Sequence, residues 1–183
     1  MNHLRLLPPS PKDASHPDEA CLNAFQEQLD YIFRTLRRFG VAATETEDLA
    51  HEVFLVLRRK WGEYDPSRPL RPYIFGIAFR VAGAHRRKRV REVPQLVLAI
   101  DEGMQPELAF QAKQARAVVL SALDGIPLPR RAVLVMHDLD EVPMHDVAAS
   151  LSIPLFTAYS RLRKARKELA VAIRKLTDGE GSL

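Results

Sequence analysis

The apolar positions in the first half of the chain recur at spacings of three and four residues, the period of a helix that buries one face. One such stripe occupies residues 19–39, and Gly40 suits the end of the helix that carries it. A second helix is predicted over residues 44–61, where Thr44 or Thr46 can cap the first turn. The first stripe comprises Leu22, Phe25, Leu29, Ile32, Phe33, Leu36 and Phe39, and the second comprises Leu49, Val53, Phe54, Val56 and Leu57.

A proline-rich basic segment follows these two helices. Residues 62–72 hold three prolines, which interrupt a helix and predict a loop, and Arg68 and Arg71 make this loop basic. Helix resumes at Tyr73 with one apolar face. It ends in residues 86–91, which supply five cations and no acid.

The second half of the chain is helical again, and no segment alternates apolar and polar residues as a strand would. Each break between its helices carries glycine, proline or aspartate. The pattern predicts an all-α protein with two small helical domains joined by a flexible linker. The later helices are predicted at 108–123, 129–137, 142–151 and 154–176. The predicted parts are a disordered tail (1–18), a first domain (19–92), a linker (93–111), a second domain (112–177) and a short tail (178–183).

Residues 142–167 have the order of a helix-turn-helix, with a short helix at 144–150, a tight turn and a long basic helix from Pro154. One face of the long helix is apolar and can pack, whereas the opposite face carries hydroxyl and cationic groups that suit phosphates and base edges. An isolated helix of this kind is more often a solvated amphipathic helix. The preceding short helix and turn favour DNA binding. The candidate DNA contacts are Thr157, Tyr159, Ser160, Arg161, Arg163 and Lys164.

Composition narrows the class of protein further. The formal net charge of +4 is small for 183 residues, so the clustering of the cations matters more than their total. The single cysteine, Cys21, excludes an internal disulfide framework and suits a reducing compartment. No stretch approaches the roughly 20 apolar residues that span a bilayer. We therefore expect a cytoplasmic protein with no membrane insertion.

Three motifs occur in the order found in a known family. Residues 47–54 (EDLAHEVF) resemble region 2.2 of the extracytoplasmic-function members of the sigma-70 family, and residues 71–78 (RPYIFGIA) resemble the start of region 2.3. Residues 154–167 resemble the recognition helix of region 4. With their spacing, the resemblance covers roughly residues 22–92 and 112–176. The ordered set is more specific than any one of the motifs.

The resemblance implies a sigma factor, a non-enzymatic subunit without cofactor or metal that binds RNA polymerase core and gives it promoter specificity. Region 2 would bind the polymerase clamp and open the downstream promoter element, while region 4 would read the upstream element and contact the polymerase flap. The candidate polymerase contacts are Asp48, Glu52, Leu49 and Phe54. The candidates for the downstream element and single-stranded DNA, which combine positive charge with a planar ring, are Arg68, Arg71, Tyr73, Arg80, Arg86, Arg87 and Lys88.

Promoter DNA is thus the second expected partner, and many family members have an anti-sigma factor as a third. Such a factor would cover Asp48 and Glu52, or the face of Arg161 and Lys164, because blocking either surface stops function. The chain departs from the family's common pattern at several positions, which affects the expected base preference and not the fold. Tryptophan is usual at Tyr73, asparagine is frequent at Arg80, aspartate is frequent at Ala84, and glycine is usual at Phe156.

Two other classes of function stay open at the level of sequence. A stand-alone helix-turn-helix regulator would explain the second half, but it leaves Asp48, Glu52 and the basic loop without a role. An enzyme acting on nucleic acid ranks last, because the chain has no phosphate-binding glycine loop, no HExxH spacing and no serine elbow. A carboxylate metal site near residues 138–141 is conceivable, although acids are common in a turn that ends a helix.

Overall fold

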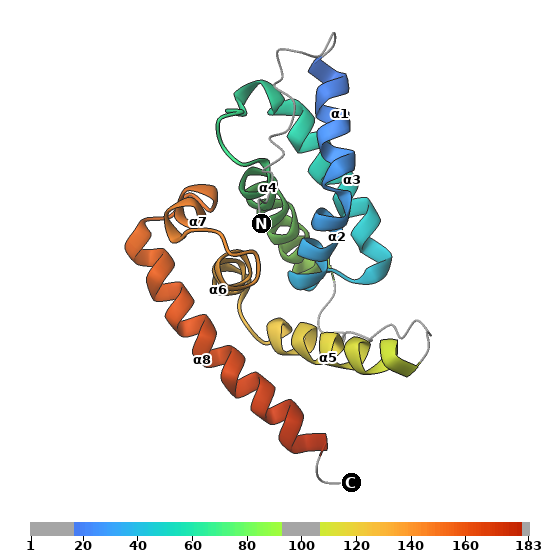
Figure 1. Cartoon of the computed structure of the whole chain (residues 1–183), viewed down its shortest axis with the longest axis vertical. Helices are drawn as coiled ribbons and strands as arrows, with labels where there is room; N and C mark the ends of the chain where they lie inside the picture. The colour runs from blue at the N-terminus through green and yellow to red at the C-terminus, as the bar shows by residue number, and fades with distance from the viewer. Residues whose placement is uncertain (1–16, 93–106, 181–183) are drawn as a thin grey trace, which may run out of the picture.

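A computed structural model of the chain describes residues 17–92 and 107–180. Within these ranges every regular element is helical and no strand occurs, which confirms the all-α prediction (Figure 1). The first group of helices comprises α1 (Pro17–Glu27), α2 (Leu29–Arg38), α3 (Ala43–Arg59), a 3-10 turn at Trp61–Glu63 and α4 (Leu70–Glu92). The second comprises α5 (Glu107–Asp124), α6 (Leu128–Leu134), a π-helical turn at Val135–Leu139, α7 (Met144–Ser150) and α8 (Leu155–Glu180). The predicted tail up to residue 16 and residues 93–106 of the predicted linker lie outside the described residues.

The prediction of one continuous helix over residues 19–39 was wrong, because Gln28 separates α1 from α2. The backbone of Gln28 has φ −102° and ψ 6°, and its N–H donates to Phe25 O at 3.1 Å, which closes a four-residue turn. Its side-chain Oε1 accepts a hydrogen bond from Arg71 Nε at 2.8 Å. The bend lets both helices pack on α3. The end of α2 follows the prediction, since Gly40 has φ +82° and Val41 N donates to Leu36 O at 3.1 Å.

The predicted threonine caps of α3 were also wrong. Ala42 occupies the capping position without a side-chain hydrogen bond, and α3 begins at Ala43, so both threonines already lie inside the first turn. Thr46 is buried, and its hydroxyl donates to Ala42 O at 2.7 Å. The next long helix, α4, begins at Leu70 rather than at Tyr73. A proline fits the first turn of a helix, so Pro72 does not delay the start.

The two groups of helices pack against each other. Helix α4 contacts α7, helix α2 contacts α5, and the buried apolar residues form one contiguous cluster drawn from both groups (Figure 1). Arg131 of α6 is 1% exposed at this junction. Its guanidinium donates to Ile126 O at 3.1 Å, to Asp124 Oδ1 and Asp124 O at 2.8 Å each, and to Arg38 O at 3.4 Å. The guanidinium therefore joins the carbonyls at the end of α5 to the end of α2.

Candidate nucleic-acid interface

Helices α7 and α8 form the predicted helix-turn-helix. After α7, Leu151 N donates to Val147 O at 3.1 Å and Ile153 N donates to Ala148 O at 3.0 Å. Ser152 lies between them in the left-handed region, with φ +55°. These bonds use the last carbonyls of α7 and reverse the chain within a few residues. Helix α8 then starts directly after Pro154, whose carbonyl accepts a hydrogen bond from Ala158 N at 3.1 Å.

One face of α8 is buried against the second domain and leaves the other face open. Ala158, Leu162 and Ala165 are each at most 5% exposed. On the open side Phe156 is 84% exposed and Tyr159 is 55% exposed. Burial of small and apolar side chains thus holds the helix in place, while its first two turns can contact a ligand.

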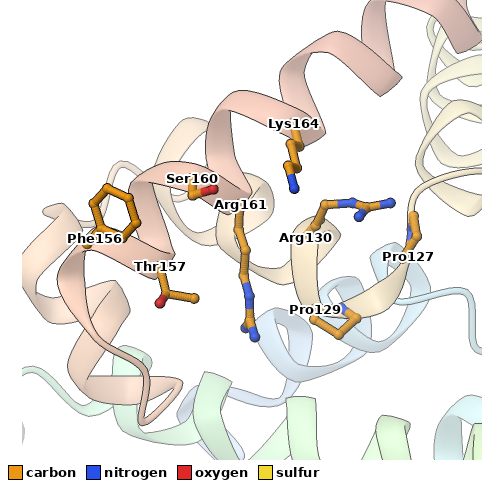
Figure 2. Close-up of a pocket in the computed structure, with 8 residues that line it drawn as sticks. All are labelled: Pro127, Pro129, Arg130, Phe156, Thr157, Ser160, Arg161 and Lys164. Atoms are coloured by element: carbon orange, nitrogen blue, oxygen red, sulfur yellow. The ribbon is translucent and has the colours of Figure 1, made fainter.

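Four of the six predicted upstream contacts surround a hollow between α8 and the start of α6. Figure 2 shows Arg161 and Lys164 extending from α8 toward α6, next to Arg130. Arg130 is fixed there by Glu168 of α8, with Nε–Oε2 at 2.9 Å and Nη2–Oε1 at 2.8 Å. The hollow therefore combines three cations with two hydroxyl groups, a set that suits phosphate oxygens. Its lining residues are Pro127, Pro129, Arg130, Phe156, Thr157, Ser160, Arg161 and Lys164.

The other two predicted upstream contacts, Tyr159 and Arg163, are exposed but do not line the hollow. Sequence reasoning missed Arg130, because it lies on another helix and no motif joins it to α8. It treated Phe156 only as a departure from the family pattern. The spacing gave a usable signal, since Phe156 precedes Ser160 by four residues and Arg163 by seven, which places the three on one side of a helix.

The cations predicted to bind single-stranded DNA are exposed on the first domain, but some already have partners. Arg71 lies over the ring of Tyr31, with its guanidinium carbon 5.4 Å from the ring centroid. Arg80 Nη2 donates to Ser152 Oγ of the helix-turn-helix at 3.2 Å. Arg68 Nε lies 3.6 Å from Asp65 Oδ2. Arg86, Arg87 and Lys88 are exposed. The structure thus brings Arg80 beside the second domain, which the sequence did not predict.

Tyr73 is half-buried and is not a free platform for bases. Its ring lies 5.2 Å from that of Tyr64, and its hydroxyl donates to Lys60 O at 3.1 Å. Burial raises the pKa of the Tyr73 phenol, and the negative charge of Glu63 adds to the effect. Tyr73 therefore stays a neutral donor that holds the loop before α4, and the residue is only partly exposed.

The acidic pair predicted to bind polymerase is open to solvent. Asp48 and Glu52 are exposed and lie four residues apart on α3, so they share a face. Leu49 is 3% exposed and belongs to the core, and this burial does not support the predicted direct contact. Phe54 is partly buried, with its ring 4.9 Å from that of Phe25. Of the four predicted polymerase contacts, the two carboxylates are therefore the fully exposed ones.

Two of the carboxylates near residues 138–141 have partners other than a metal ion. Asp138 pairs with Arg166, and Asp140 accepts hydrogen bonds from Tyr31 and Arg38. Among the residues that the structure describes, no group of three or more histidine, cysteine or acidic side chains could hold a metal ion. The described part of the chain also contains no helix with the length and apolar character needed to cross a membrane.

Comparison with known families and proteins matches both halves of the structure. The family Sigma-70 region 2 matches residues 24–92, and the family Sigma-70, region 4 matches residues 113–169. The chain is similar to the ECF RNA polymerase sigma factor RpoE of Cereibacter sphaeroides, with 28% identity over 158 residues, 84% of this chain and 87% of that protein. It is also similar to the RNA polymerase sigma factor CnrH of Cupriavidus metallidurans, with 25% identity over 153 residues, 78% of this chain and 80% of the relative.

Two solved structures share the fold. CnrH in complex with the cytosolic domain of CnrY has a TM-score of 0.61 at 20% identity, over 86% of this chain and 89% of the other. The sigma factor RpoE in complex with the anti-sigma factor NepR from Bartonella quintana has a TM-score of 0.62 at 21% identity, over 82% of this chain and 96% of the other.

Proposed function

The chain belongs to the extracytoplasmic-function group of the sigma-70 family, whose members bind RNA polymerase and direct promoter-specific initiation, and we propose on this premise how its two domains divide the work. Residues 19–92 act as region 2, which binds the polymerase clamp and opens the downstream promoter element. Residues 112–177 act as region 4, which reads the upstream element and contacts the polymerase flap. The protein itself carries out no chemical reaction and works in the cytoplasm.

The observation that carries this proposal is the hollow beside the recognition helix. Arg130, Arg161 and Lys164 meet there from two helices, which suits the backbone of duplex DNA on either side of a groove. Phe156, which also lines the hollow, and Arg163, which does not, are exposed on the same helix and are proposed to contact base edges. In this arrangement the hollow fixes the register of region 4 on the duplex, and the open side reads its sequence.

Region 2 is proposed to hold the opened strand on α4 and the loop before it. The exposed cations along this surface attract the backbone, and the partly exposed Tyr73 is proposed to contact an unstacked base at the edge of its packed ring. Contacts to a flipped base offset an unstacking cost of a few kcal/mol, so opening needs no nucleotide hydrolysis. Asp48 and Glu52 on α3 face away from the core and are proposed to bind a basic surface of the polymerase clamp.

An anti-sigma factor is proposed as a further partner, since both structural neighbours are complexes, CnrH with the cytosolic domain of CnrY and RpoE with the anti-sigma factor NepR. On this chain it would cover Asp48 and Glu52, or the face of Arg161 and Lys164. Charge reversal at each pair, followed by capture of a candidate factor, tests the idea. Unaltered capture by both variants would contradict it.

The direct test of function is transcription from a library of promoter fragments by RNA polymerase core enzyme, with and without the protein. Initiation at a defined subset of fragments only when the protein is present supports the proposal and identifies both promoter elements. Tight duplex binding by the protein alone, without any initiation, would instead support a stand-alone regulator.

A further inference from the structure

The second domain lies on the face of α4 that is proposed to hold single-stranded DNA. Gly76, Arg80 and Gly83 share this face, because they lie four and three residues apart on one helix. Arg80 donates to Ser152 Oγ, as described above. A Cβ atom at Gly76 would lie 2.6 Å from the backbone oxygen of Ser150, and one at Gly83 would lie 3.8 Å from Leu128 Cδ2. The backbone of α7 therefore touches that of α4 where Gly76 has no side chain.

A second contact joins the domains at α2. Asp140 accepts hydrogen bonds from Tyr31 Oη at 2.9 Å and from Arg38 Nη1 at 2.7 Å. Its side chain is 12% exposed, and Tyr31 is 6% exposed, so both groups are largely removed from water. Burial raises the pKa of Tyr31, and Asp140 raises it further, which keeps the phenol protonated as a donor. Contacts at α4 and at α2 thus hold the second domain against the first.

We propose that the second domain competes with single-stranded DNA for this face of α4, so that the free protein is closed and releases α7 from α4 before it binds the downstream element. The inference rests on the proposed DNA-binding role of α4. A strand bound along α4 needs the guanidinium of Arg80 and free access near Gly76. In the closed form Ser152 occupies the guanidinium of Arg80, and the carbonyl of Ser150 blocks access near Gly76.

Closure has a selective consequence for the two proposed DNA sites. Phe156 stays 84% exposed and the hollow around Arg161 stays open in the closed form, so duplex binding by α8 is not obstructed. Of the two proposed sites, the single-strand site on α4 is the one that the second domain contacts, at Gly76 and Arg80. A protein closed in this way can meet duplex DNA, but it holds an opened strand only after the domains separate.

The Gly76→Ala variant tests the contact with little effect on the first domain. Alanine is favoured over glycine inside a helix by about 1 kcal/mol, and the three heavy atoms nearest to the new Cβ belong to Ser150 and to the flexible end of Arg80. The Ser150 oxygen at 2.6 Å belongs to the backbone and forces α7 to move away. Gly83→Ala is the matched control on the same helix, because its nearest contacts, 3.5 Å and 3.8 Å, are ordinary packing distances.

Two measurements on the full chain decide the outcome. Small-angle X-ray scattering should give a larger radius of gyration for Gly76→Ala than for the wild type and Gly83→Ala. Fluorescence anisotropy with a labelled single-stranded DNA of mixed sequence should show about tenfold tighter binding by Gly76→Ala, which corresponds to a closed population of about 90% in the wild type. Binding to a duplex of the same sequence should not change.

A Gly76→Ala variant that stays as compact as the wild type, or that opens without tighter single-strand binding, overturns the inference. If Gly76→Ala does not fold, as judged by circular dichroism, Asp140→Ala takes its place, because it removes the shared acceptor of Tyr31 and Arg38. Transcription by the wild-type chain with core enzyme distinguishes a failure of the competition proposal from a failure of the proposed function. Promoter-specific initiation with no opening in either variant contradicts only the competition, whereas no initiation at all contradicts the proposed function.

Discussion

Asp138 accepts two hydrogen bonds from Arg166, with Oδ2 to Nε at 2.9 Å and Oδ1 to Nη2 at 2.7 Å, and this pair joins the π-helical turn to the recognition helix. The hydrogen bond from Arg166 is the main reason that the pKa of Asp138 lies below its usual range. The carboxylate is therefore more strongly favoured in the folded protein than in the unfolded chain.

The stabilisation by Asp138 should depend on pH in the acid range. Because its folded-state pKa is depressed, the contribution is complete above the unfolded pKa of about 4 and is lost as the pH falls through the folded value. Asp138→Asn should lower the free energy of unfolding at pH 7 by at most about 1 kcal/mol, since Arg166 is largely exposed. Urea unfolding between pH 3 and 7 should show that the difference in free energy of unfolding between the wild type and Asp138→Asn shrinks below about pH 4. Asp30→Asn, which removes an exposed carboxylate from α2, is the matched control.

Replacement of Arg131 by lysine should destabilise the fold. Its guanidinium reaches four oxygen atoms in different directions, and the single ammonium group of lysine would leave some of them without a donor. Each buried carbonyl left unsatisfied costs about 1–3 kcal/mol, so Arg131→Lys should lower the free energy of unfolding by about 2 kcal/mol or more. Arg130→Lys is the control. It affects the partly exposed ion pair with Glu168, so the free energy of unfolding should fall by less than about 1 kcal/mol. Equal losses in urea unfolding would contradict the assigned role of Arg131.

Phe156 is expected to favour thymine at one position of the upstream element. An exposed aromatic ring at the start of the recognition helix can pack on the C5-methyl group of thymine in the major groove. Burying one methyl group contributes about 0.8 kcal/mol, so Phe156→Ala should reduce the preference about fourfold. Selection of bound sequences from randomised duplexes measures this preference for thymine. Val171→Ala, an exposed apolar residue farther along α8, should leave the selected sequence unchanged.

Arg163 and Lys164 should affect DNA binding differently although they are adjacent. Lys164 lines the hollow and is expected to contact phosphate, so Lys164→Ala should weaken binding to all duplexes alike and reduce the salt slope by about 1. Arg163 lies outside the hollow, and Arg163→Ala should cost about 1–3 kcal/mol only on duplexes with the preferred base. Binding isotherms at several salt concentrations distinguish the two patterns. The reverse assignment would contradict the proposed orientation of α8.

Charge reversal of Asp48 and Glu52 should weaken binding to polymerase core. Lysine at both positions places positive charge against the basic surface proposed for the clamp, and we expect at least about tenfold lower affinity. Fluorescence-detected titration of labelled protein with core enzyme measures the change. Glu27→Lys, at an exposed position of α1, is the control. The same loss in the control would show a general effect of net charge.

The sequence by itself determined the helical architecture and the helix-turn-helix. Apolar spacing is a local property that depends on the helical period, and proline and glycine act on the backbone within a few residues. The short helix at Met144–Ser150 and the closing turn at Gly40 are therefore found where the pattern placed them. The cationic and hydroxyl residues of α8 were identified for the same reason, since they share one helix.

Tertiary structure decided which of the predicted residues can act. The break at Gln28 has no glycine or proline to signal it and follows from packing on α3 and a hydrogen bond from Arg71. Leu49 and Phe54 occupy the same apolar stripe, but the surrounding helices bury the first and leave the second partly exposed. Arg130 enters the hollow beside α8 only because α6 packs against that helix.

The contact between the two domains was outside the reach of the sequence pattern. It depends on complementary shapes and charges of residues far apart in the chain, such as Gly76 against Ser150 and Tyr31 with Asp140. Hydrophobic periodicity reports which side of a helix is buried, but it carries no information on the element that buries it. Local sequence thus specifies the elements and their chemistry, and long-range packing decides which DNA-binding surfaces are open.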